Sequence, residues 1–496
     1  MGRDVDHREF TRADRRRFRD KIRRSLDALT VMLREAKFDF ERPMTGLEIE
    51  LNLVDDAGEP ANVNAEVLAS IADPAFQTEI AQFNIEINVA PRELGGPAFA
   101  DLEEEVRASL NSADERARTS GGRMVMIGVL PTLMPRHVKI DSLSKNPRYA
   151  LLNEQILAAR GEDMHLSIRG VESLSTYTDS ITPEAACTSV QLHLQVSPAE
   201  FASYWNAAQA IAGAQLAVGA NSPFLFGMQL WRETRIPLFE QVTDTRSEEL
   251  KEQGVRPRVW FGERWVTSVF DLFEENARYF PALLPICEPE DPIEQLAAGE
   301  IPEMAELALH NGTIYRWNRP IYAVVGSGDA ATPHLRVENR VLPAGPTVVD
   351  ALANAAFYYG LVRTLATSTR PVWTQMSFHA AEENFHAGAR DGIDAELYWP
   401  GVGQVPATEL VLRRLLPLAH EGLAAFGVAD ADRERLLGII EQRCLTGING
   451  AAWQVRTVQA LQERGLERVP ALHAMLERYV EHMHANQPVH TWELPA

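Results

Sequence analysis

The sequence has only three cysteines among its 496 residues, and they lie far apart at Cys187, Cys287 and Cys444. Without a Cys-x-x-Cys pair, we expect neither a disulfide framework nor a thiolate zinc site. So few thiols are typical of a reducing compartment, and we therefore predict a cytoplasmic localisation.

Long apolar runs are missing as well. The amino-terminal region mixes acids with arginines and has no apolar core, so we expect no signal or transit peptide. The nearest approach to a membrane span is the uncharged stretch 201–231, which five residues interrupt: Asn206, Gln209, Gln215, Asn221 and Pro223. A lipid-facing helix would not tolerate them, and we expect no membrane partner.

Positive charge is scarce. There are 48 Lys and Arg residues against 69 Asp and Glu residues, for a net charge of −21. Residues 1–37 are an exception, because they hold five more basic than acidic residues, which leaves −26 for the remainder. An acidic body repels nucleic acid, so we expect no nucleic-acid partner. The hydrophobic content of 45% is that of an ordinary globular protein.

Several common catalytic motifs are absent. The sequence has no Walker A motif, no Gly-x-Gly-x-x-Gly after a strand, no His-Glu-x-x-His and no Gly-x-Ser-x-Gly. If ATP is used, something other than a P-loop must bind it, and no protein nucleophile stands out.

The hydrophobic periodicity predicts an α+β fold. Residues 11–37 place Phe18, Ile22, Leu26, Leu29 and Leu33 at helical spacing, which predicts an amphipathic helix docked on the body. Period-two patterns predict half-buried strands at 45–54 and 83–89 and a further strand at 189–196, and 124–130 is interpreted as a more fully buried strand. Helical patterns cover 100–119, 198–219, 346–368, 373–389, 406–426, 431–443, 451–464 and 468–484. Because strands come first and helices follow without regular alternation, a doubly wound sheet is disfavoured.

Two strands carry carboxylates on their polar faces. Glu48 and Glu50 share one face of the strand 45–54, about 7 Å apart by two ~3.3 Å steps. Their oxygen atoms suit Mg²⁺ or Mn²⁺, although both could simply face solvent. Glu86 lies on the polar face of the strand 83–89, with Glu79 seven residues earlier. If the two strands pair, three carboxylates gather on one face, as in a multi-metal phosphoryl-transfer site.

Other polar stripes offer further candidates. Gln191 and His193 share the polar face of the strand 189–196, where His193 is either a ligand or a structural residue. Glu338 and Arg340 also share a face, pairing a metal ligand with a fixed guanidinium for phosphate or carboxylate. The segment 310–319 is polar, aromatic and cationic, and it is equally compatible with a surface loop of ordinary ion pairs.

Taken together, these motifs resemble the glutamate–cysteine ligase (carboxylate–amine ligase) family. The resemblance rests on seven segments in the expected order: 45–50, 84–91, 188–194, 220–224, 231–235, 338–340 and 384–392. It implies a glutamine-synthetase-like α+β fold, with a curved antiparallel sheet forming an active-site cup surrounded by helices. We accordingly predict an amino-terminal helix (1–44), a catalytic domain (45–400) and a helical carboxy-terminal extension packed on it (401–496).

The resemblance also implies a chemistry: ATP, two or three Mg²⁺ ions (or Mn²⁺) and an acyl-phosphate route to an amide. Glu48, Glu50, Glu86, Glu338 and Glu79 would be the metal ligands. Arg340, Arg319 and Arg235 would hold phosphate or the glutamate carboxylate. Gln191, His193, Asn221 and Arg316 would contact the substrates. The acceptor amine is not identified by any residue, and cysteine is carried over from the family.

Two other functions compete with an ATP-dependent carboxylate–amine ligase. A phosphotransferase on a similar cup needs the same metals and arginines but releases a phosphorylated product. A regulatory or binding protein that kept the fold is disfavoured, because buried like charges without a metal are destabilising. The expected partners are small molecules: ATP, glutamate and an amino acid or other amine. A homo-oligomer is left open, because Leu436, Ile439, Ile440 and Trp453 suit either a core or a subunit interface.

Overall fold

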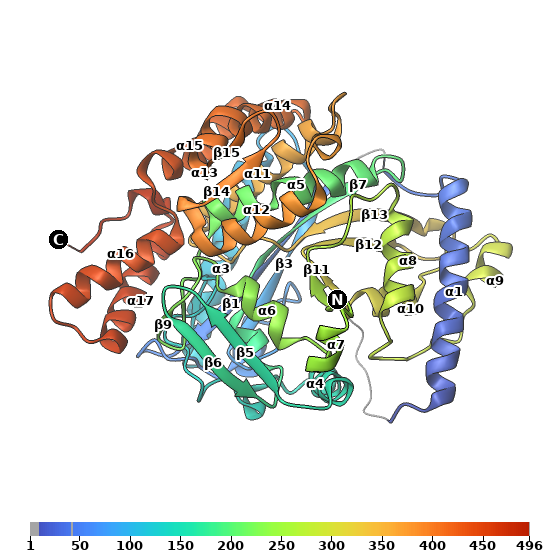
Figure 1. Cartoon of the computed structure of the whole chain (residues 1–496), viewed down its shortest axis with the longest axis horizontal. Coiled ribbons are helices and arrows are strands. Elements are labelled where there is room, and N and C mark those ends of the chain that lie inside the picture. Colours follow the sequence, from blue (N-terminus) through green and yellow to red (C-terminus); the bar gives the residue numbers. More distant parts are fainter. Residues whose placement is uncertain (1–8, 41–42, 496) are drawn as a thin grey trace.

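The computed structural model describes residues 9–40 and 43–495 and is built around one seven-stranded sheet (Figure 1). Six strands run in the order β12-β13-β7-β1-β3-β2, β4 pairs with β1, and every neighbouring pair is antiparallel. The strands are β1 (Met44–Val54), β2 (Phe76–Thr78), β3 (Asn84–Glu93), β4 (Arg123–Val125), β7 (Val190–Val196), β12 (Asn318–Val325) and β13 (Thr332–Asn339). The predicted α+β fold with a curved antiparallel sheet is confirmed.

The register of the sheet brings the polar stripes together. Glu50 on β1 lies directly opposite Glu86 on β3, and Glu48 lies opposite Gln191 on β7. On the other side of β7, His193 lies opposite Glu338 of β13. Chain segments separated by up to 290 residues therefore meet on one face of the sheet.

The strand predicted at 124–130 is only partly correct. β4 ends at Val125, and residues 126–130 continue as irregular but buried chain. The carbonyl of Gly128 accepts a hydrogen bond from the amide of Thr188, so the chain pairs with a loop at this point. A Cβ at Gly128 would lie 2.9 Å from Pro343, which shows how closely other segments approach. The segment is apolar because it is buried, but it pairs with β1 only at Arg123–Val125, so the strand does not extend to residue 130.

Both faces of the sheet centre are buried. The apolar face is covered by α3 (Ala98–Thr119), α5 (Phe201–Gly219) and α11 (Val348–Ala366), as Figure 1 shows. On the polar face, Gln191 and His193 are only 3% and 7% exposed. The expectation of half-buried strands is therefore wrong for β1 from Glu50 onward, because the polar face carries a buried site instead of facing water.

Helices surround the sheet, and most of them match the helical patterns of the sequence. Besides α3, α5 and α11, the helices are α1 (Arg12–Arg34), α2 (Asn64–Ile71), α4 (Pro147–Arg160), α6 (Arg235–Val242), α7 (Glu248–Glu252), α8 (Val269–Tyr279), α9 (Pro292–Ala297), α10 (Ala305–Asn311), α12 (Phe378–Asp391), α13 (Ala407–Leu410), α14 (Leu416–Ala425), α15 (Asp430–Thr446), α16 (Gly450–Glu463) and α17 (Arg468–Ala485). A π-helical turn at Val411–Leu415 joins α13 to α14. Within the described ranges, none of the helices combines the length and apolar character needed to cross a bilayer.

Four short ribbons complete the fold. They are β5 (Met164–Arg169) with β6 (Ser173–Thr178), β8 (Phe224–Leu225) with β9 (Met228–Gln229), β10 (Val259–Trp260) with β11 (Tyr315–Arg316), and β14 (Glu396–Trp399) with β15 (Gly403–Pro406). Of these, β10 and β11 form a parallel pair. A 3₁₀ turn, η2 (Thr182–Ala186), leads into β7.

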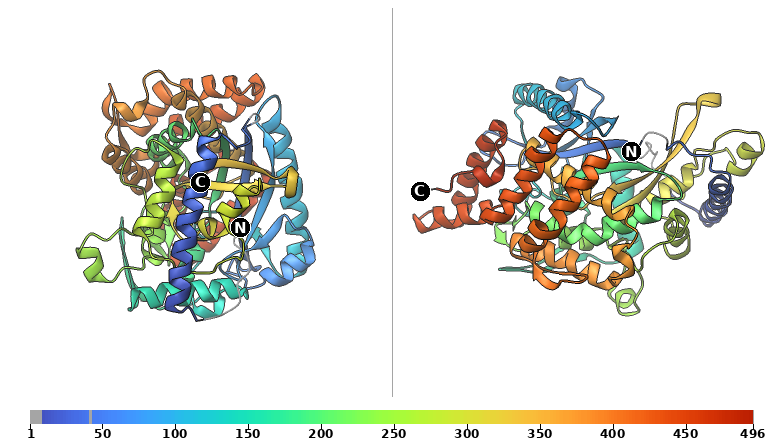
Figure 2. Two further views of the ribbon diagram at one scale, coloured as in Figure 1. Left: turned by 90° about the vertical axis from the view of Figure 1, so that its right-hand side faces the viewer. Right: turned by 90° about the horizontal axis from the view of Figure 1, so that it is seen from above.

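The amino-terminal helix lies along one edge of the molecule (Figure 2). Phe18, Ile22 and Leu29 are buried as predicted, and Leu26 and Leu33 are partly buried against the core. The helix packs on α8, α9 and α10. A capping box between Thr11 and Asp14 sets its first turn.

The carboxy-terminal helices contact the body of the molecule. Helices α14 and α15 pack on α11, and Arg443 of α15 forms a fully buried ion pair with Asp350 of α11 at 2.7 Å. Leu436, Ile440 and Trp453 are completely buried within the chain, so these tail positions serve its own core and not a subunit interface. The domain boundary at residue 400 stays a prediction.

Candidate active site

Two groups of side chains with potential metal-ligand atoms lie on the polar face of the sheet. The Glu50 cluster consists of Glu50, Glu79 and Glu86, and the Glu338 cluster consists of Glu48, His193 and Glu338. Within each cluster, one ligand atom per residue lies within 4.8 Å of the others. The structure therefore brings together all five carboxylates that were predicted as metal ligands.

Arginines hold the Glu338 cluster in place. Arg319 on β12 donates two hydrogen bonds to the Glu338 carboxylate, one of them 3.0 Å long from Nη2 to Oε1. Arg340 Nη1 lies 3.5 Å from the same oxygen atom. Burial opposes the charge on Glu338, but these two guanidinium groups hold its pKa well below the usual range. Glu338 is therefore ionised at neutral pH, although it is only 2% exposed.

The hydrogen bonds of His193 determine its tautomer. Arg336 Nε donates to His193 Nδ1 at 3.1 Å, so the ring proton must lie on Nε2. That nitrogen then donates to Glu48 Oε1 at 3.0 Å. Burial works against a charged Glu48, but the bond from His193 and the charge of Arg340 lower its pKa overall. In this state, Nε2 is a proton donor and not a free metal-binding lone pair.

Arg336 is a site residue that we did not predict. It lies on β13, two residues before Glu338, and therefore points to the same face of the sheet. Besides His193, it contacts His334, whose Nε2 lies 2.9 Å from Arg336 Nη1. The period-two spacing of Arg336, Glu338 and Arg340 was the signal that could have identified it.

The Glu50 carboxylate is bound by neutral donors. Gln191 Nε2 donates to Oε1 at 3.0 Å, and the backbone amide of Ser189 donates to Oε2 at 2.6 Å. Arg340 donates to the amide oxygen of Gln191, so Gln191 links Arg340 to Glu50. Burial raises the pKa of Glu50 even though Arg340 and the Ser189 amide oppose the shift.

Ionising Glu79 and Glu86 beside Glu50 would place further negative charges in the same buried cluster, which is unfavourable. Burial, followed by the charge of Glu50, raises the pKa of Glu79 to about 8. Burial and the charges of Glu79, Glu48 and Glu50 raise the pKa of Glu86 well above its usual value, against a 2.8 Å bond from Asn88. Crowded carboxylate oxygens of this kind are the hard donors that Mg²⁺ binds, so the donor set fits this cation.

Glu184 is another buried acid near the clusters, and the sequence did not suggest it. It lies on η2, is 6% exposed, and its Oε2 has no hydrogen-bond partner among the described residues. Burial, reinforced by the charge of Glu79, raises its pKa to about 8. A residue in an irregular turn has no periodicity, so nothing in the local pattern could have identified it.

Arg340 is the link between the two clusters. It contacts Glu338 directly and Glu50 through Gln191. Burial disfavours its charge, but the surrounding carboxylates raise its pKa above the ordinary value, so it stays cationic. With Arg319 and Arg336 on the same face, the sheet presents three guanidinium groups beside its carboxylates. This arrangement can hold a phosphate group next to a divalent cation.

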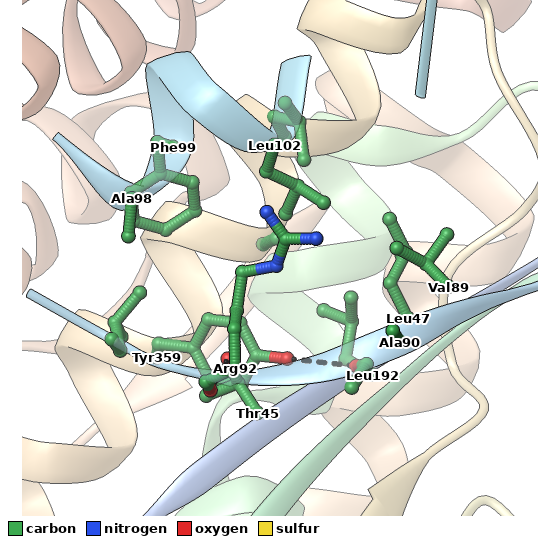
Figure 3. A pocket seen from close by; sticks show the side chains of 14 residues that line it. Thr45, Leu47, Val89, Ala90, Arg92, Ala98, Phe99, Leu102, Leu192 and Tyr359 are labelled. Carbon is green, nitrogen blue, oxygen red and sulfur yellow. Dashed lines mark hydrogen bonds between the residues drawn. The ribbon is translucent and has the colours of Figure 1, made fainter. Parts of the chain in front are cut away.

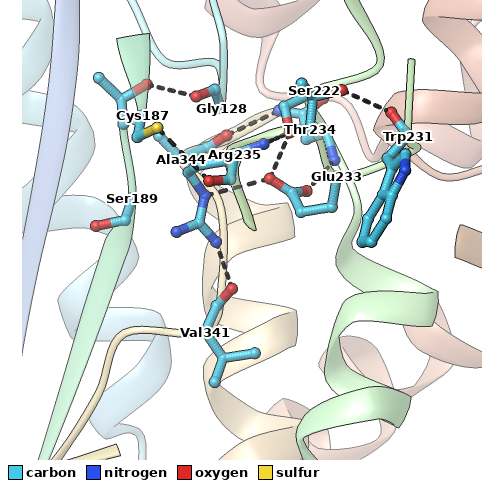
Figure 4. Close-up of polar contacts among 12 residues, drawn as sticks. Gly128, Cys187, Ser189, Ser222, Trp231, Glu233, Thr234, Arg235, Val341 and Ala344 are labelled. Carbon is cyan, nitrogen blue, oxygen red and sulfur yellow. Dashed lines mark hydrogen bonds and ion pairs between the residues drawn. The ribbon is translucent and has the colours of Figure 1, made fainter. Parts of the chain in front are cut away.

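The guanidinium of Arg235 is directed toward Glu233 and the backbone of Val341 (Figure 4). Its guanidinium is bonded to Glu233 at 3.2 Å and to the backbone carbonyls of Arg340 and Val341. It is only 3% exposed, and two of its hydrogen bonds go to the backbone that carries Arg340, so it positions that backbone. Its predicted catalytic role is not supported by direct contact with the clusters.

Asn221 and Arg316 contact other parts of the protein. Asn221 Nδ2 donates to the carbonyl of Ala344 at 2.7 Å and to the hydroxyl of Tyr479 at 2.8 Å. Arg316 is paired with Glu275 at 3.0 Å. The structure does not bring either side chain to the clusters, and their predicted substrate contacts stay predictions.

A small apolar cavity lies on the opposite face of the sheet (Figure 3). It has a volume of about 20 Å³ and is lined by Leu47 and Leu192 from the sheet, with Phe99 of α3 and Tyr359 of α11. The hydroxyl of Tyr359 shares its one hydrogen between the carbonyls of Gly46 and His193, at 3.2 and 3.1 Å. No residue of either cluster lines this cavity.

Comparison with known proteins identifies relatives of this fold. The model of glutamate-cysteine ligase family 2 matches residues 44–471. A glutamate–cysteine ligase from Francisella tularensis, solved in complex with AMP, superposes with a TM-score of 0.55 at 12% identity, covering 93% of this chain and 91% of that one. A bifunctional glutathione synthetase from Pasteurella multocida superposes with a TM-score of 0.52 at 12% identity, covering 93% of this chain and 54% of that one. No protein with a curated description matches the sequence.

Proposed function

The chain belongs to glutamate–cysteine ligase family 2, and from this premise we propose that it forms an amide bond between a carboxylate and an amine at the expense of ATP. One observation supports this proposal most directly. Five carboxylates and three arginines meet on one face of the sheet: six of them lie on four strands, while Glu79 and Arg340 directly follow β2 and β13. Such a site can stabilise charge that moves between phosphate oxygens, which is the main requirement of phosphoryl transfer.

Mg²⁺ fits the carboxylates of this chain. Glu50, Glu79 and Glu86 would hold one ion, and Glu48 with Glu338 would contribute oxygen atoms to another. When bound, the cation neutralises charge on the phosphate oxygens and on the crowded carboxylates. Raised pKa values at Glu79 and Glu86 support this proposal, because a cation is what would allow both groups to ionise together.

The arginines of the chain would bind and orient the reacting groups. Arg340 and Arg319 are fixed by Glu338, so their free N–H groups are already directed when an anion arrives. In the proposed reaction, the substrate carboxylate attacks the terminal phosphorus of ATP and ADP leaves; the amine then attacks the acyl carbon, loses a proton and displaces phosphate to give the amide. The buried polar face limits the access of water, which would otherwise hydrolyse the acyl phosphate.

Membership of the family supports a finer proposal for the substrates. We propose glutamate as the carboxylate donor and an amino acid as the acceptor, with cysteine as the first amine to test. A cytoplasmic location fits the three cysteines, which are all free thiols in the structure.

The function is tested by phosphate release from ATP and Mg²⁺ with L-glutamate, screened across single amino acids and small amines. We expect release only with glutamate plus one amine, and a product mass equal to their sum less one water. Accumulation of a phosphorylated product would instead identify a phosphotransferase. No release with any amine would contradict the proposed ligase activity.

The metal assignment is tested by Glu86→Gln, which keeps the side chain's shape but removes its charge. We expect turnover to fall by at least about a hundredfold, since the site loses one metal ligand and the hydrogen bond from Asn88 that orients it. The stabilisation of the protein by Mg²⁺ should fall as well. Glu104→Gln, on the exposed face of α3, is the matched control and should change neither. Full turnover in Glu86→Gln would show that Glu86 does not hold the metal.

A further inference from the structure

Two asparagines lie on the apolar face of the sheet, next in sequence to residues of the candidate site. Asn339 is the last residue of β13, between Glu338 and Arg340, and strand alternation turns its side chain to the face opposite Glu338. Asn318 is the first residue of β12, directly before Arg319, and it is the cross-strand partner of Asn339. Both asparagine side chains are fully buried.

Helix α5 packs on β12 and β13 and supplies the partners of both asparagines. Gln215 and Asn339 form a reciprocal amide pair with two hydrogen bonds of 3.3 Å. Asn339 Nδ2 also donates to Asn318 Oδ1 at 2.8 Å, and Asn318 Nδ2 donates to Gln209 Oε1 at 2.7 Å. The amide network consists of these four residues: Gln209, Gln215, Asn318 and Asn339.

The direction of the hydrogen bonds in the amide network follows from one carbonyl group. Gln209 Nε2 donates to the carbonyl of Phe261 at 2.6 Å, and because a carbonyl only accepts, Gln209 must turn its Oε1 toward Asn318. The same requirement then passes to Asn339 and from there to Gln215. Every side-chain nitrogen and oxygen atom of the network has a partner, and all four side chains are at most 1% exposed. The network therefore has one arrangement.

The core of the protein does not require amides at these positions. The same face of β13 carries Leu335 and Val337, and α5 has no charged residue along its length. Replacing both partners of a buried hydrogen bond by apolar groups of the same shape is close to neutral for stability. What the amides add is direction, because a fully satisfied polar network specifies one geometry of the helix relative to the strands.

The amide network holds the point at which the β12–β13 ladder ends. Asn318 and Asn339 form the last pair of the ladder, and beyond them the amide of Arg340 donates to the carbonyl of Trp317 at 2.8 Å. Trp205 of α5 adds a hydrogen bond of 2.8 Å from its Nε1 to the carbonyl of Asn318. Ends of elements open more easily than their centres. A shift at this end would move the two site residues on either side of Asn339 together.

We infer that the amide network positions Glu338, Arg340 and Arg319 for the proposed reaction, with Asn339 as the central positioning residue. The inference rests on the proposed function, because that function gives these three side chains their role. The three side chains bond to one another on the polar face, and the network fixes their backbone from the apolar face. A misplacement of about 1 Å can lower a rate about a hundredfold, even when its cause lies away from the reacting atoms.

The inference is tested with Asn339→Leu combined with Gln215→Met, which removes the reciprocal amide pair and approximately keeps the shape of both side chains. Mn²⁺ binding is titrated by electron paramagnetic resonance without substrates, and turnover is measured in the ligase assay, both well below the melting temperature. We expect the affinity for one Mn²⁺ ion and the turnover each to fall at least about tenfold, as for residues that support metal ligands. Gln215→Met alone leaves the sheet residues unchanged and should lower both quantities to a smaller extent.

Asn206→Leu is the matched control on the same helix. Asn206 is 2% exposed and exchanges two hydrogen bonds with the backbone of Val266, and none of its bonds reaches β12 or β13. The control should lower the melting temperature, as the network variants do, but leave Mn²⁺ affinity and turnover unchanged.

The outcomes separate positioning from general stability. Mn²⁺ affinity and turnover that stay at the wild-type level in both network variants would overturn the inference, and so would equal losses in the control. Absence of turnover in the wild-type protein would contradict the proposed function, whereas the Mn²⁺ titration would still decide the role of the network. A wild-type protein that binds no Mn²⁺ would overturn the inference together with the metal assignment.

Discussion

Glu184 offers a direct test of the electrostatics of the candidate site. Its carboxyl group is buried, one oxygen atom has no partner among the described residues, and its pKa is raised from 4.5 to about 8. The cause is burial first and the negative charge of Glu79 second. Replacement by glutamine keeps the size of the side chain and removes its titration, so Glu184→Gln isolates this one charge.

The magnitude follows from the pKa shift. In the unfolded chain the group ionises near its ordinary value, so between about pH 4.5 and pH 8 only the folded protein keeps the proton. The contribution of this group to the free energy of unfolding is fully present below pH 4.5 and is lost as the pH rises through 8. At about 1.4 kcal/mol per pKa unit, the free energy of unfolding can change through this group by about 5 kcal/mol at most. Allowing for relaxation and water entry, we expect on the order of 2 kcal/mol between about pH 6 and pH 8.

The assay is urea unfolding in EDTA at several pH values in this interval. Glu184→Gln should become progressively more stable than the wild-type protein as the pH rises, with an unchanged dependence on urea concentration. Glu104→Gln, an exposed change of the same kind, should show no such trend. A stability difference that is constant with pH, or that shrinks as the pH rises, would refute the assignment of Glu184 as a buried acid with a raised pKa.

Two further predictions concern stability away from the site. Arg443→Met should lower the free energy of unfolding by about 3 kcal/mol, because it leaves the buried carboxylate of Asp350 without its partner; a loss below about 1 kcal/mol in urea unfolding would contradict this. Burial alone would lower the pKa of His386, but the bond and charge of Glu240 raise it above the ordinary 6.5. The pair therefore stabilises the protein below pH 6.5, and this stabilisation is lost as the pH rises through the folded pKa. His386→Gln should accordingly lower the melting temperature more at low pH than at high pH. An equal loss of melting temperature at low and high pH, measured by calorimetry, would contradict this prediction.

Much of the candidate site could be predicted before the structure was known. Period-two alternation identified β1, β3 and β7, and it placed Glu48, Glu50 and Glu86 on their polar faces. A short strand has only two faces, so the side of each residue follows from its number alone. The same logic, applied to β13, would have added Arg336 to Glu338 and Arg340.

Other residues could not be assigned in this way. Arg235 and Asn221 belong to segments that resemble the family, yet their side chains bond to the backbone of distant segments, Arg235 to Arg340 and Asn221 to Ala344. Residue type and local sequence do not show whether a guanidinium contacts a substrate or a backbone carbonyl. That depends on which distant segment packs against it.

The sequence by itself determined the strands β1, β3 and β7, the helices at 12–34 and 98–119 and those of the last 150 residues, and the faces on which Glu48, Glu50 and Glu86 lie, because these follow from periodicity along the chain. Only the tertiary structure decided that Glu50 lies opposite Glu86, that the polar face is buried, and that Glu184 joins it from a turn. Burial and strand pairing depend on contacts between segments that are distant in the sequence, 36 residues for Glu50 and Glu86 and 141 residues for Glu50 and Gln191. The raised and lowered pKa values depend on those contacts as well, since a carboxylate's neighbours in space set its charge.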